Sequence, residues 1–256
     1  APSKYGRLHP EYFALVKGKR DSDPAGFDGK HGRQPCTSNP DVVRIVSEYC
    51  DRFFREHPGY DAFNISLNDG RGFCECDRCR ALDTGETQLE GYDPETGAQA
   101  RYPVITDRII AFANQVCGNL ERAHPSKKLI LFAYSQYKQP PKRVRPHPNL
   151  IVQYTMSAAM HWDPHVAGKQ IEEVAAWSGG ARNLAIYEYF IQGGFPDLPR
   201  LMPELLQPVV RKLYDLGYRH YQTQQGDGYA INGFNYYLLG RLLWNPSLDA
   251  RRIQAD

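Results

Sequence analysis

Short apolar runs of strand length alternate along this chain with longer stretches of helical period. The strand-like runs are residues 62–67, 128–134, 150–156, 183–190 and 219–224, with a sixth at 33–39. The helical stretches are residues 40–57, 105–124, 168–178, 198–217 and 229–244. Strands that alternate with helices are typical of a parallel sheet covered on both faces.

Local signals refine the helix boundaries. Asn39 followed by Pro40 predicts the start of the first long helix, because Asn caps a helix and Pro suits its first turn. Pro203 and Pro208 predict that the helix within 198–217 starts late or kinks. A polar insertion at 83–102 separates the first clear strand from its following helix.

The fold class that this pattern favours is α/β, as a (β/α)8 TIM-type barrel. An open, doubly wound sheet is the rival, but no Gly-rich phosphate loop follows any strand. If the last strand is the eighth, the segment at 33–39 is the third and 62–67 the fourth. We therefore expect residues 1–256 to be a single catalytic barrel domain covering about strands three to eight, within a longer multidomain protein.

Bulk properties exclude some functions. Lys+Arg total 31 against Asp+Glu 29, and the basic residues are scattered, so no nucleic-acid partner is expected. No apolar run approaches the roughly 20 residues that span a bilayer. Tyr is abundant, at 17 residues, and offers a stacking face together with a hydroxyl, which suits sugar binding.

Catalytic groups of a barrel lie where the strands end. Asp69 follows the fourth predicted strand, Glu188 ends the seventh and Asp227 follows the eighth. A pair of facing carboxylates is the machinery of glycoside hydrolysis, in which one acts as acid and the other as nucleophile or orienting group. We predict Glu188 and Asp69 as this pair, since a strand interior disfavours Glu, although Asn-Asp-Gly is also a common turn sequence.

Other polar and aromatic side chains near strand ends are candidate sugar contacts. They are Asn68, Tyr134, Gln136, Tyr154, Trp162, Tyr187, Tyr189, Gln224 and Asp227. For any single Tyr, an ordinary place in the core or a strand is the competing interpretation.

Three cysteines, Cys74, Cys76 and Cys79, lie within six residues of one another. With Cys36 or a histidine as the fourth ligand they could form a closed tetrahedral zinc site. The competing interpretations are a local disulfide with a spare thiol and reduced cysteines buried in the core. Two histidines four residues apart, His161 and His165, could also bind metal, but this stretch shows no helical pattern.

Four stretches together resemble a known family. "HPEYFALVKGKR", "CTSNPDVV", "SLNDGRGFCECDRCRALD" and "YEYF" are similar to the bacterial domain of unknown function 4838, a group that includes glycoside hydrolase family 163, the endo-β-N-acetylglucosaminidases of complex N-glycans. The resemblance covers His9 to about Leu248.

The resemblance implies a TIM-barrel glycosidase in a secreted or periplasmic protein with flanking domains. It implies a retaining reaction without an organic cofactor, in which the acetamido group of the substrate is the expected nucleophile. The chain is also similar to clan A glycosidases, which place Asn-Glu after strand four, but here the pair is Asn68-Asp69. Asp69 could then be the acid/base of a double displacement or a partner in substrate-assisted catalysis.

Two other functions compete with hydrolysis of a β-linked, N-acetylhexosamine-containing glycan. One is a carbohydrate-binding barrel that has lost catalysis, which predicts sugar binding without dependence on Glu188. The other is a metal-dependent hydrolase using the cysteines or the pair His161 and His165, which predicts that a chelator abolishes activity.

Overall fold

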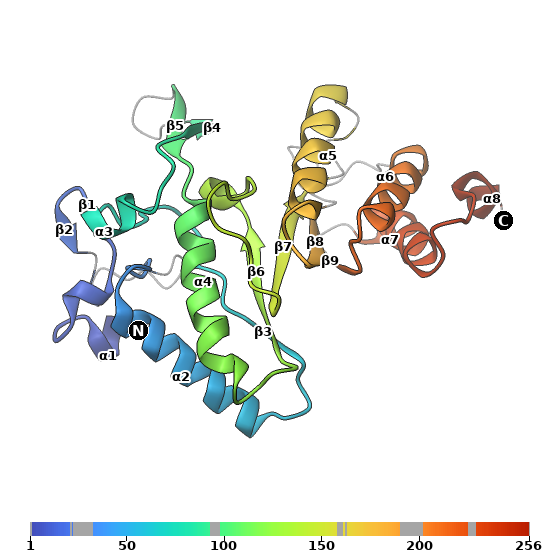
Figure 1. The fold of residues 1–256 in the computed structure, drawn as a ribbon. Helices are drawn as coiled ribbons and strands as arrows, with labels where there is room; N and C mark the ends of the chain where they lie inside the picture. Colours follow the sequence, from blue (N-terminus) through green and yellow to red (C-terminus); the bar gives the residue numbers. More distant parts are fainter. Residues whose placement is uncertain are drawn as a thin grey trace. The chain divides into compact units, whose positions relative to one another are not determined.

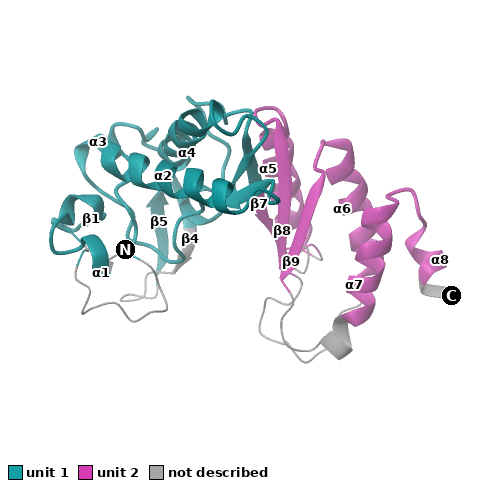
Figure 2. Ribbon diagram, turned by 90° about the horizontal axis from the view of Figure 1, so that it is seen from below, with its two compact units in different colours: residues 1–152 teal, residues 153–256 magenta. Residues whose placement is uncertain are grey.

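The computed structural model describes residues 2–20, 22, 33–92, 98–157, 161, 163–189, 202–224 and 229–255. The chain forms two compact units, Ala1–Val152 and Gln153–Asp256, drawn in separate colours in Figure 2. The division falls within strand β7 (Leu150–Met156), so the first residues of β7 belong to unit 1 and the rest to unit 2.

Unit 1 contains the long helices α2 and α4 and two parallel strands (Figure 1). In chain order its elements are α1 (Pro2–Tyr5), the 3-10 helix η1 (Pro10–Tyr12), β1 (Leu15–Val16), β2 (Lys19–Arg20), α2 (Pro40–Glu56), β3 (Ala62–Asn64), α3 (Asp77–Arg80), β4 (Thr87–Tyr92), β5 (Gln99–Pro103), α4 (Thr106–Glu121), β6 (Lys128–Ala133) and the 3-10 helix η2 (Ser135–Tyr137). Strand β3 pairs with β6 in parallel, with Phe63 opposite Leu129.

Helices α2 and α4 pack side by side (Figure 1), and polar contacts fix their pairing. Asn119 donates to the Ser47 hydroxyl at 3.0 Å, and a nitrogen of His124 lies 2.9 Å from Asp51. Phe53 of α2 packs on Phe63 of β3, with ring centroids 4.4 Å apart. The side chain of Phe63 therefore faces the helices, and its strand neighbour Asn64 points to the opposite face.

The predicted start of α2 is confirmed. The Asn39 side chain accepts a hydrogen bond from the backbone N–H of Asp41 at 2.9 Å, and Pro40 opens the helix. The Asn39 amide also donates to the carbonyl of Glu11, so the cap ties α2 to the preceding segment.

Removing this cap should cost stability. We expect Asn39→Ala to lower the free energy of unfolding by about 1 kcal/mol, because the N–H of Asp41 loses its acceptor. Urea denaturation followed by circular dichroism measures the change, with the exposed Gln115→Ala on α4 as the control. Equal stability of Asn39→Ala and the wild type would show that the cap contributes nothing.

Unit 2 contains helices α5 to α8 and the parallel strands β8 and β9 (Figure 2). Its elements are the rest of β7, then α5 (Pro164–Ser178), β8 (Asn183–Tyr189), α6 (Pro203–Asp215), β9 (His220–Gln224), α7 (Tyr229–Trp244) and α8 (Ala250–Ala255). Helices α6, α7 and α8 share an apolar core that includes Leu206, Val210, Leu238 and Leu242. Tyr221 of β9 packs against this core.

Several predicted elements agree closely with the structure. Strand 150–156 is β7 to the residue, and strands 128–134, 183–190 and 219–224 correspond to β6, β8 and β9. Helix α6 begins at Pro203 and contains Pro208, as the two prolines predict. The fold class is mixed α/β with parallel strands, while its assignment to strands three to eight of a barrel remains a prediction.

One prediction about unit 1 is corrected by the structure. The segment 33–39 forms no strand; Pro35 makes an isolated bridge to Phe13, and the chain then turns through Cys36 into the cap at Asn39. Pro has no backbone N–H to donate to a ladder, which explains why pairing stops there. The polar insertion at 83–102, for which no element was predicted, contains β4 and most of β5, which pair antiparallel.

Candidate functional site

Four cysteine sulfurs converge in unit 1. Cys36 lies between the bridge at Pro35 and α2, while Cys74, Cys76 and Cys79 lie in the loop and short helix α3 that follow β3. All four sulfurs lie within 4.8 Å of one another. Four sulfur ligands arranged in this way could hold a metal ion.

The sulfur of Cys36 is almost equidistant from the other three. It lies 3.6 Å from that of Cys74, 3.7 Å from that of Cys76 and 3.9 Å from that of Cys79. A disulfide needs about 2.05 Å, so none of these contacts is a covalent bond, and all the cysteines are free thiols. The sequence prediction that Cys36 joins the other three therefore agrees with the geometry.

The predicted tip Asn68-Asp69 lies near this cluster in the chain and is held by residues 33 and 34. The Asn68 side chain donates to the carbonyl of Arg33 at 2.5 Å, and Gln34 donates to the carbonyl of Asn68 at 2.7 Å. Asp69 is exposed and accepts a hydrogen bond from the N–H of Gly70 at 2.9 Å. Asp69 thus forms the turn that its sequence suggests, with its carboxylate open to solvent.

Glu188 is completely buried in unit 2, at 0% exposure. The hydroxyl of Tyr221 donates to one carboxylate oxygen at 3.1 Å, and the N–H of Tyr189 lies 3.0 Å from the other. Burial raises the pKa of Tyr221 well above its usual value, and the charge of Glu188 raises it further. Tyr221 therefore stays protonated and can only donate to the carboxylate.

Strand alternation separates Glu188 from the tyrosines on either side of it. In the β8–β9 register, Glu188 pairs with Thr223, so it shares a face with Tyr221, which packs against the helices. Tyr187 and Tyr189 project from the opposite face. The structure thus brings Glu188 together with Tyr221, a contact that sequence reasoning missed, and not with the two flanking tyrosines.

The opposite face of this sheet carries a group of phenol and amide side chains. We call it the tyrosine–glutamine face; its members are Gln153, Tyr187, Tyr189, Gln222 and Gln224. The register places Tyr187 beside Gln222 and Tyr189 beside Gln224. Gln222 and Gln224 are exposed.

Contacts within the tyrosine–glutamine face hold its side chains together. The rings of Tyr187 and Tyr189 meet edge to face, 5.1 Å apart. Gln153 donates to the side-chain carbonyl of Gln222 at 3.1 Å. The hydroxyl of Tyr187 donates to the side-chain carbonyl of Gln224 at 3.5 Å. The alternation along β7 and β9 could have pointed to Gln153 and Gln222, which sequence reasoning did not select.

The remaining predicted contacts are dispersed. Tyr154 is fully buried and donates to Glu173 of α5 at 2.5 Å, so it belongs to the layer between sheet and helix. In unit 1, Gln136 is buried while Tyr134 is partly exposed at the end of β6. Between them Ser135 adopts a left-handed backbone with φ of 51°, and its carbonyl accepts from Gln88. Left-handed non-glycine residues are strained and cluster at functional sites.

The histidine pair is not assembled into a metal site. His161 is buried with one ring nitrogen 3.0 Å from Gln170, whereas His165 is exposed in the first turn of α5, where its N–H bonds to Asp163. Trp162 and Asp227, both predicted as sugar contacts, lie outside the described residues.

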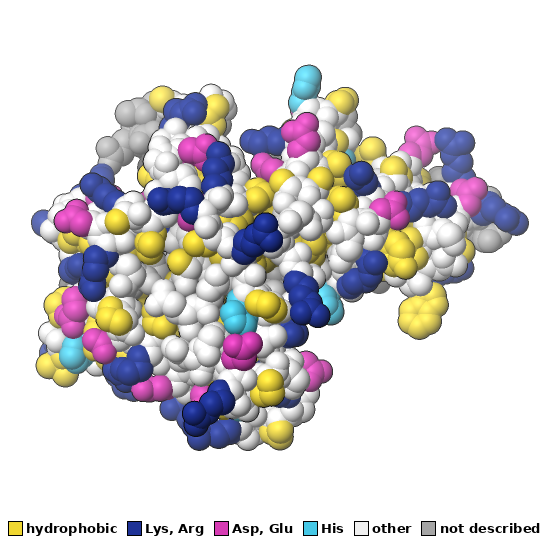
Figure 3. All heavy atoms as spheres, viewed as in Figure 1, with side chains coloured by type: hydrophobic (Ala, Val, Ile, Leu, Met, Phe, Trp, Pro, Cys, Tyr) yellow, Lys and Arg dark blue, Asp and Glu magenta, His cyan; other side chains and the backbone are white. Residues whose placement is uncertain are grey.

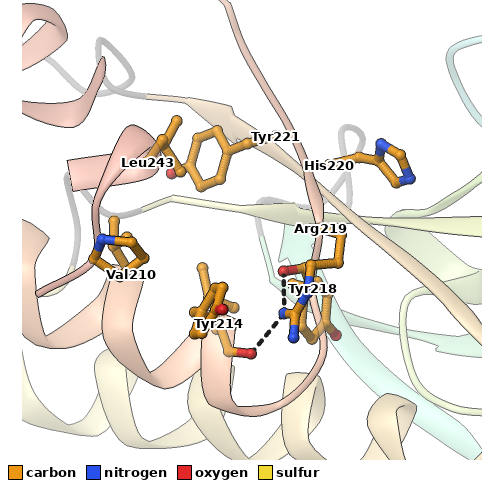
Figure 4. Close-up of a pocket in the computed structure, with 9 residues that line it drawn as sticks. Val210, Tyr214, Tyr218, Arg219, His220, Tyr221 and Leu243 are labelled. Atoms are coloured by element: carbon orange, nitrogen blue, oxygen red, sulfur yellow. Dashed lines mark hydrogen bonds between the residues drawn. The ribbon is translucent and has the colours of Figure 1, made fainter. Parts of the chain in front are cut away.

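A cavity of about 320 Å³ lies between α6, α7 and the start of β9 (Figure 4). Val210, Tyr218 and Leu243 give it a largely apolar lining, and Arg219 closes one side by donating to the carbonyls of Tyr214 and Tyr218. The cavity lies at the start of β9, away from the strand end that carries Gln224, and it holds none of the predicted site residues.

The charged side chains are of both signs on the face that Figure 3 shows. On the face shown in Figure 3, Lys and Arg side chains are interspersed with Asp and Glu. Among the described helices, none has the length and apolar character needed to cross a bilayer.

Comparisons with known proteins identify a family and find distant structural similarity. The family model described as "Domain of unknown function (DUF4838)" matches residues 1–256. A catalytic mutant of Gan42B, a GH42 β-galactosidase from G. stearothermophilus, aligns with 86% of this chain and 39% of its own, at 12% identity and a TM-score of 0.44. The chain thus spans well under half of that structure. No curated protein matches the sequence.

Proposed function

The chain belongs to the DUF4838 family, and from the geometry of unit 2 we propose that it is part of a glycoside hydrolase acting on a β-linked glycan that contains N-acetylhexosamine. The observation that carries the proposal is the tyrosine–glutamine face. Sugar rings present apolar C–H faces that stack on phenol rings, and their hydroxyls both donate and accept hydrogen bonds. Tyr187 and Tyr189 supply rings, and the exposed amides of Gln222 and Gln224 supply both donors and acceptors.

The proposed chemistry uses Glu188 and Asp69. One carboxyl protonates the oxygen of the departing sugar, and the bond from that oxygen to the anomeric carbon breaks. The other carboxylate attacks that carbon or orients the substrate's acetamido group to do so. Water then completes the hydrolysis, with net retention. Glu188 lies in unit 2 and Asp69 in unit 1.

The cellular setting belongs to the same proposal. A hydrolase of complex N-glycans meets its substrate outside the cytoplasm, so we propose a secreted or periplasmic bacterial protein whose flanking domains belong to the same polypeptide. No organic cofactor takes part in the proposed reaction.

Glycan binding tests the proposal directly. Tyr187→Ala and Gln224→Ala should each weaken binding of a complex N-glycan about 3–10-fold, because a stacking face or a polar contact is lost. Isothermal titration calorimetry of the wild type and both variants measures the effect.

The matched control is Tyr214→Ala, which removes an exposed tyrosine of α6 in the same unit but outside the tyrosine–glutamine face. It should bind like the wild type. A cello-oligosaccharide lacks acetamido groups, so comparing its binding with that of the complex N-glycan tests whether the site selects an N-acetylated sugar. Equal binding by Tyr187→Ala and the wild type would exclude this face as the sugar site.

A further inference from the structure

We propose that Cys36, Cys74, Cys76 and Cys79 bind one zinc ion in a closed, structural site. In a tetrahedral zinc–thiolate centre each Zn–S bond is about 2.3 Å, so the sulfurs lie about 3.8 Å apart. The three contacts of Cys36, at 3.6, 3.7 and 3.9 Å, have this length. The near equality of the distances favours four ligands around one ion over any single pair joined as a disulfide.

Hydrogen-bond donors around the sulfurs fit thiolate ligands. The backbone N–H of Leu15 donates to the sulfur of Cys74 at 3.3 Å, and the guanidinium of Arg20 approaches the same sulfur at 3.7 Å. Four thiolates around Zn²⁺ carry a net charge of about −2, which the nearby Arg20 partly offsets. The hydroxyl of Ser38 lies 3.1 Å from the sulfur of Cys79.

Burial indicates a structural ion. Cys36, Cys74 and Cys79 are at most 2% exposed, and four protein ligands leave no open position for substrate. Exclusively sulfur ligands in tetrahedral geometry select zinc or an iron centre over magnesium or calcium.

The site would join three separate segments of unit 1. The β1–β2 hairpin supplies Leu15 and Arg20, the segment before α2 supplies Cys36, and the loop and helix α3 after β3 supply the other three ligands. Gln34, two residues before Cys36, donates to the carbonyl of Asn68. The ion would therefore fix the segment that holds the Asn68-Asp69 tip, a consequence that does not depend on the proposed glycan reaction.

Metal analysis tests the site. We expect about one zinc per chain by plasma mass spectrometry of the full chain purified in reductant. Cys79→Ala should lose this zinc. The matched control is Cys117→Ala, which removes a buried thiol from the core of α4, and it should keep the zinc. Burial raises the pKa of Cys117 to about 12, so that thiol stays protonated in the core.

Cobalt substitution provides a readout that holds if Cys79→Ala does not fold. Co²⁺ exchanged into the wild type should give the intense visible absorption and the thiolate charge-transfer bands of tetrahedral sulfur ligation, and one equivalent of zinc should abolish both. A wild type with less than about a tenth of a zinc per chain, or with a mass lower by the two hydrogens of a disulfide, would overturn the proposal. Bound iron, or equal loss of zinc from Cys117→Ala, would also overturn it.

Discussion

Glu188→Gln is expected to lower glycan hydrolysis about 10²–10⁴-fold while glycan binding and folding are retained. Gln has the shape of Glu: its side-chain carbonyl can accept the hydrogen bond from the Tyr189 N–H, and its amide can donate to the Tyr221 hydroxyl. An amide, however, cannot donate or take up the catalytic proton, nor act as a nucleophile. Initial rates on complex N-glycans and aryl β-glycosides, compared with binding measured by calorimetry, separate the two effects.

Glu188→Ala should behave differently, because it removes the acceptor as well as the charge. Tyr221 would keep a buried hydroxyl without its carboxylate partner, and the truncated side chain would leave a cavity. We expect the free energy of unfolding to fall by about 2–4 kcal/mol, measured by urea denaturation.

The orientation of Glu188 makes this pair of variants decisive. Its carboxylate lies on the face that packs against the helices, whereas the tyrosine–glutamine face projects from the other side of β8. A carboxylate with a purely structural role predicts a fully active Glu188→Gln and an unstable Glu188→Ala. That outcome would reject Glu188 as a catalytic residue. No cleavage by the wild type, with binding intact, would instead favour a carbohydrate-binding domain without catalysis.

The sequence predicted long elements well and weakly patterned ones poorly. Helix α2 and strand β7 combine strong periodicity with clear boundaries, such as the Asn39-Pro40 start. Strands β4 and β5 were missed because their residues, "TQLEGY" and "QARYP", are mostly polar, and the alternation in "QARYP" covers only a few residues. A hairpin of this kind is set by pairing between its two strands, which local composition does not reveal.

The candidate site was predictable to different degrees. The spacing of Cys74, Cys76 and Cys79 indicated a cluster, but only the folded chain brings Cys36 to within 3.9 Å of each of them. Alternation along "YEYF" already implied that Glu188 and its neighbouring tyrosines lie on opposite faces. Which face carries the helices is a tertiary property, and the sequence alone did not determine it.

A buried ion pair in unit 1 leads to the second large effect. The Arg108 guanidinium donates two hydrogen bonds of 2.8 Å to the two carboxylate oxygens of Asp83, and a further one to the carbonyl of Cys74. The two side chains are only 5% and 10% exposed. We expect Arg108→Ala to lower the free energy of unfolding by about 3–5 kcal/mol, because a buried carboxylate loses its partner. Urea denaturation measures the change.

The matched control is Arg44→Ala on α2, which removes an arginine from exposed ion pairs with Asp41 and Glu48. Exposed pairs contribute at most about 1 kcal/mol, so this variant should be nearly as stable as the wild type. Similar losses in both variants would show that burial does not strengthen the Arg108–Asp83 pair.

The pH dependence of Arg108→Ala identifies the source of its instability. Burial already raises the pKa of Asp83, and the charge of Arg108 acts against that rise. Without Arg108 the pKa should rise further above the unfolded value of about 3.9, so the folded variant binds a proton more tightly than its unfolded chain. The stability difference between the variant and the wild type should therefore shrink as the pH falls from about 7.5 to 5. A difference that stays constant over this range would assign the loss to the hydrogen bond with Cys74 and to packing, and not to the unpaired charge of Asp83.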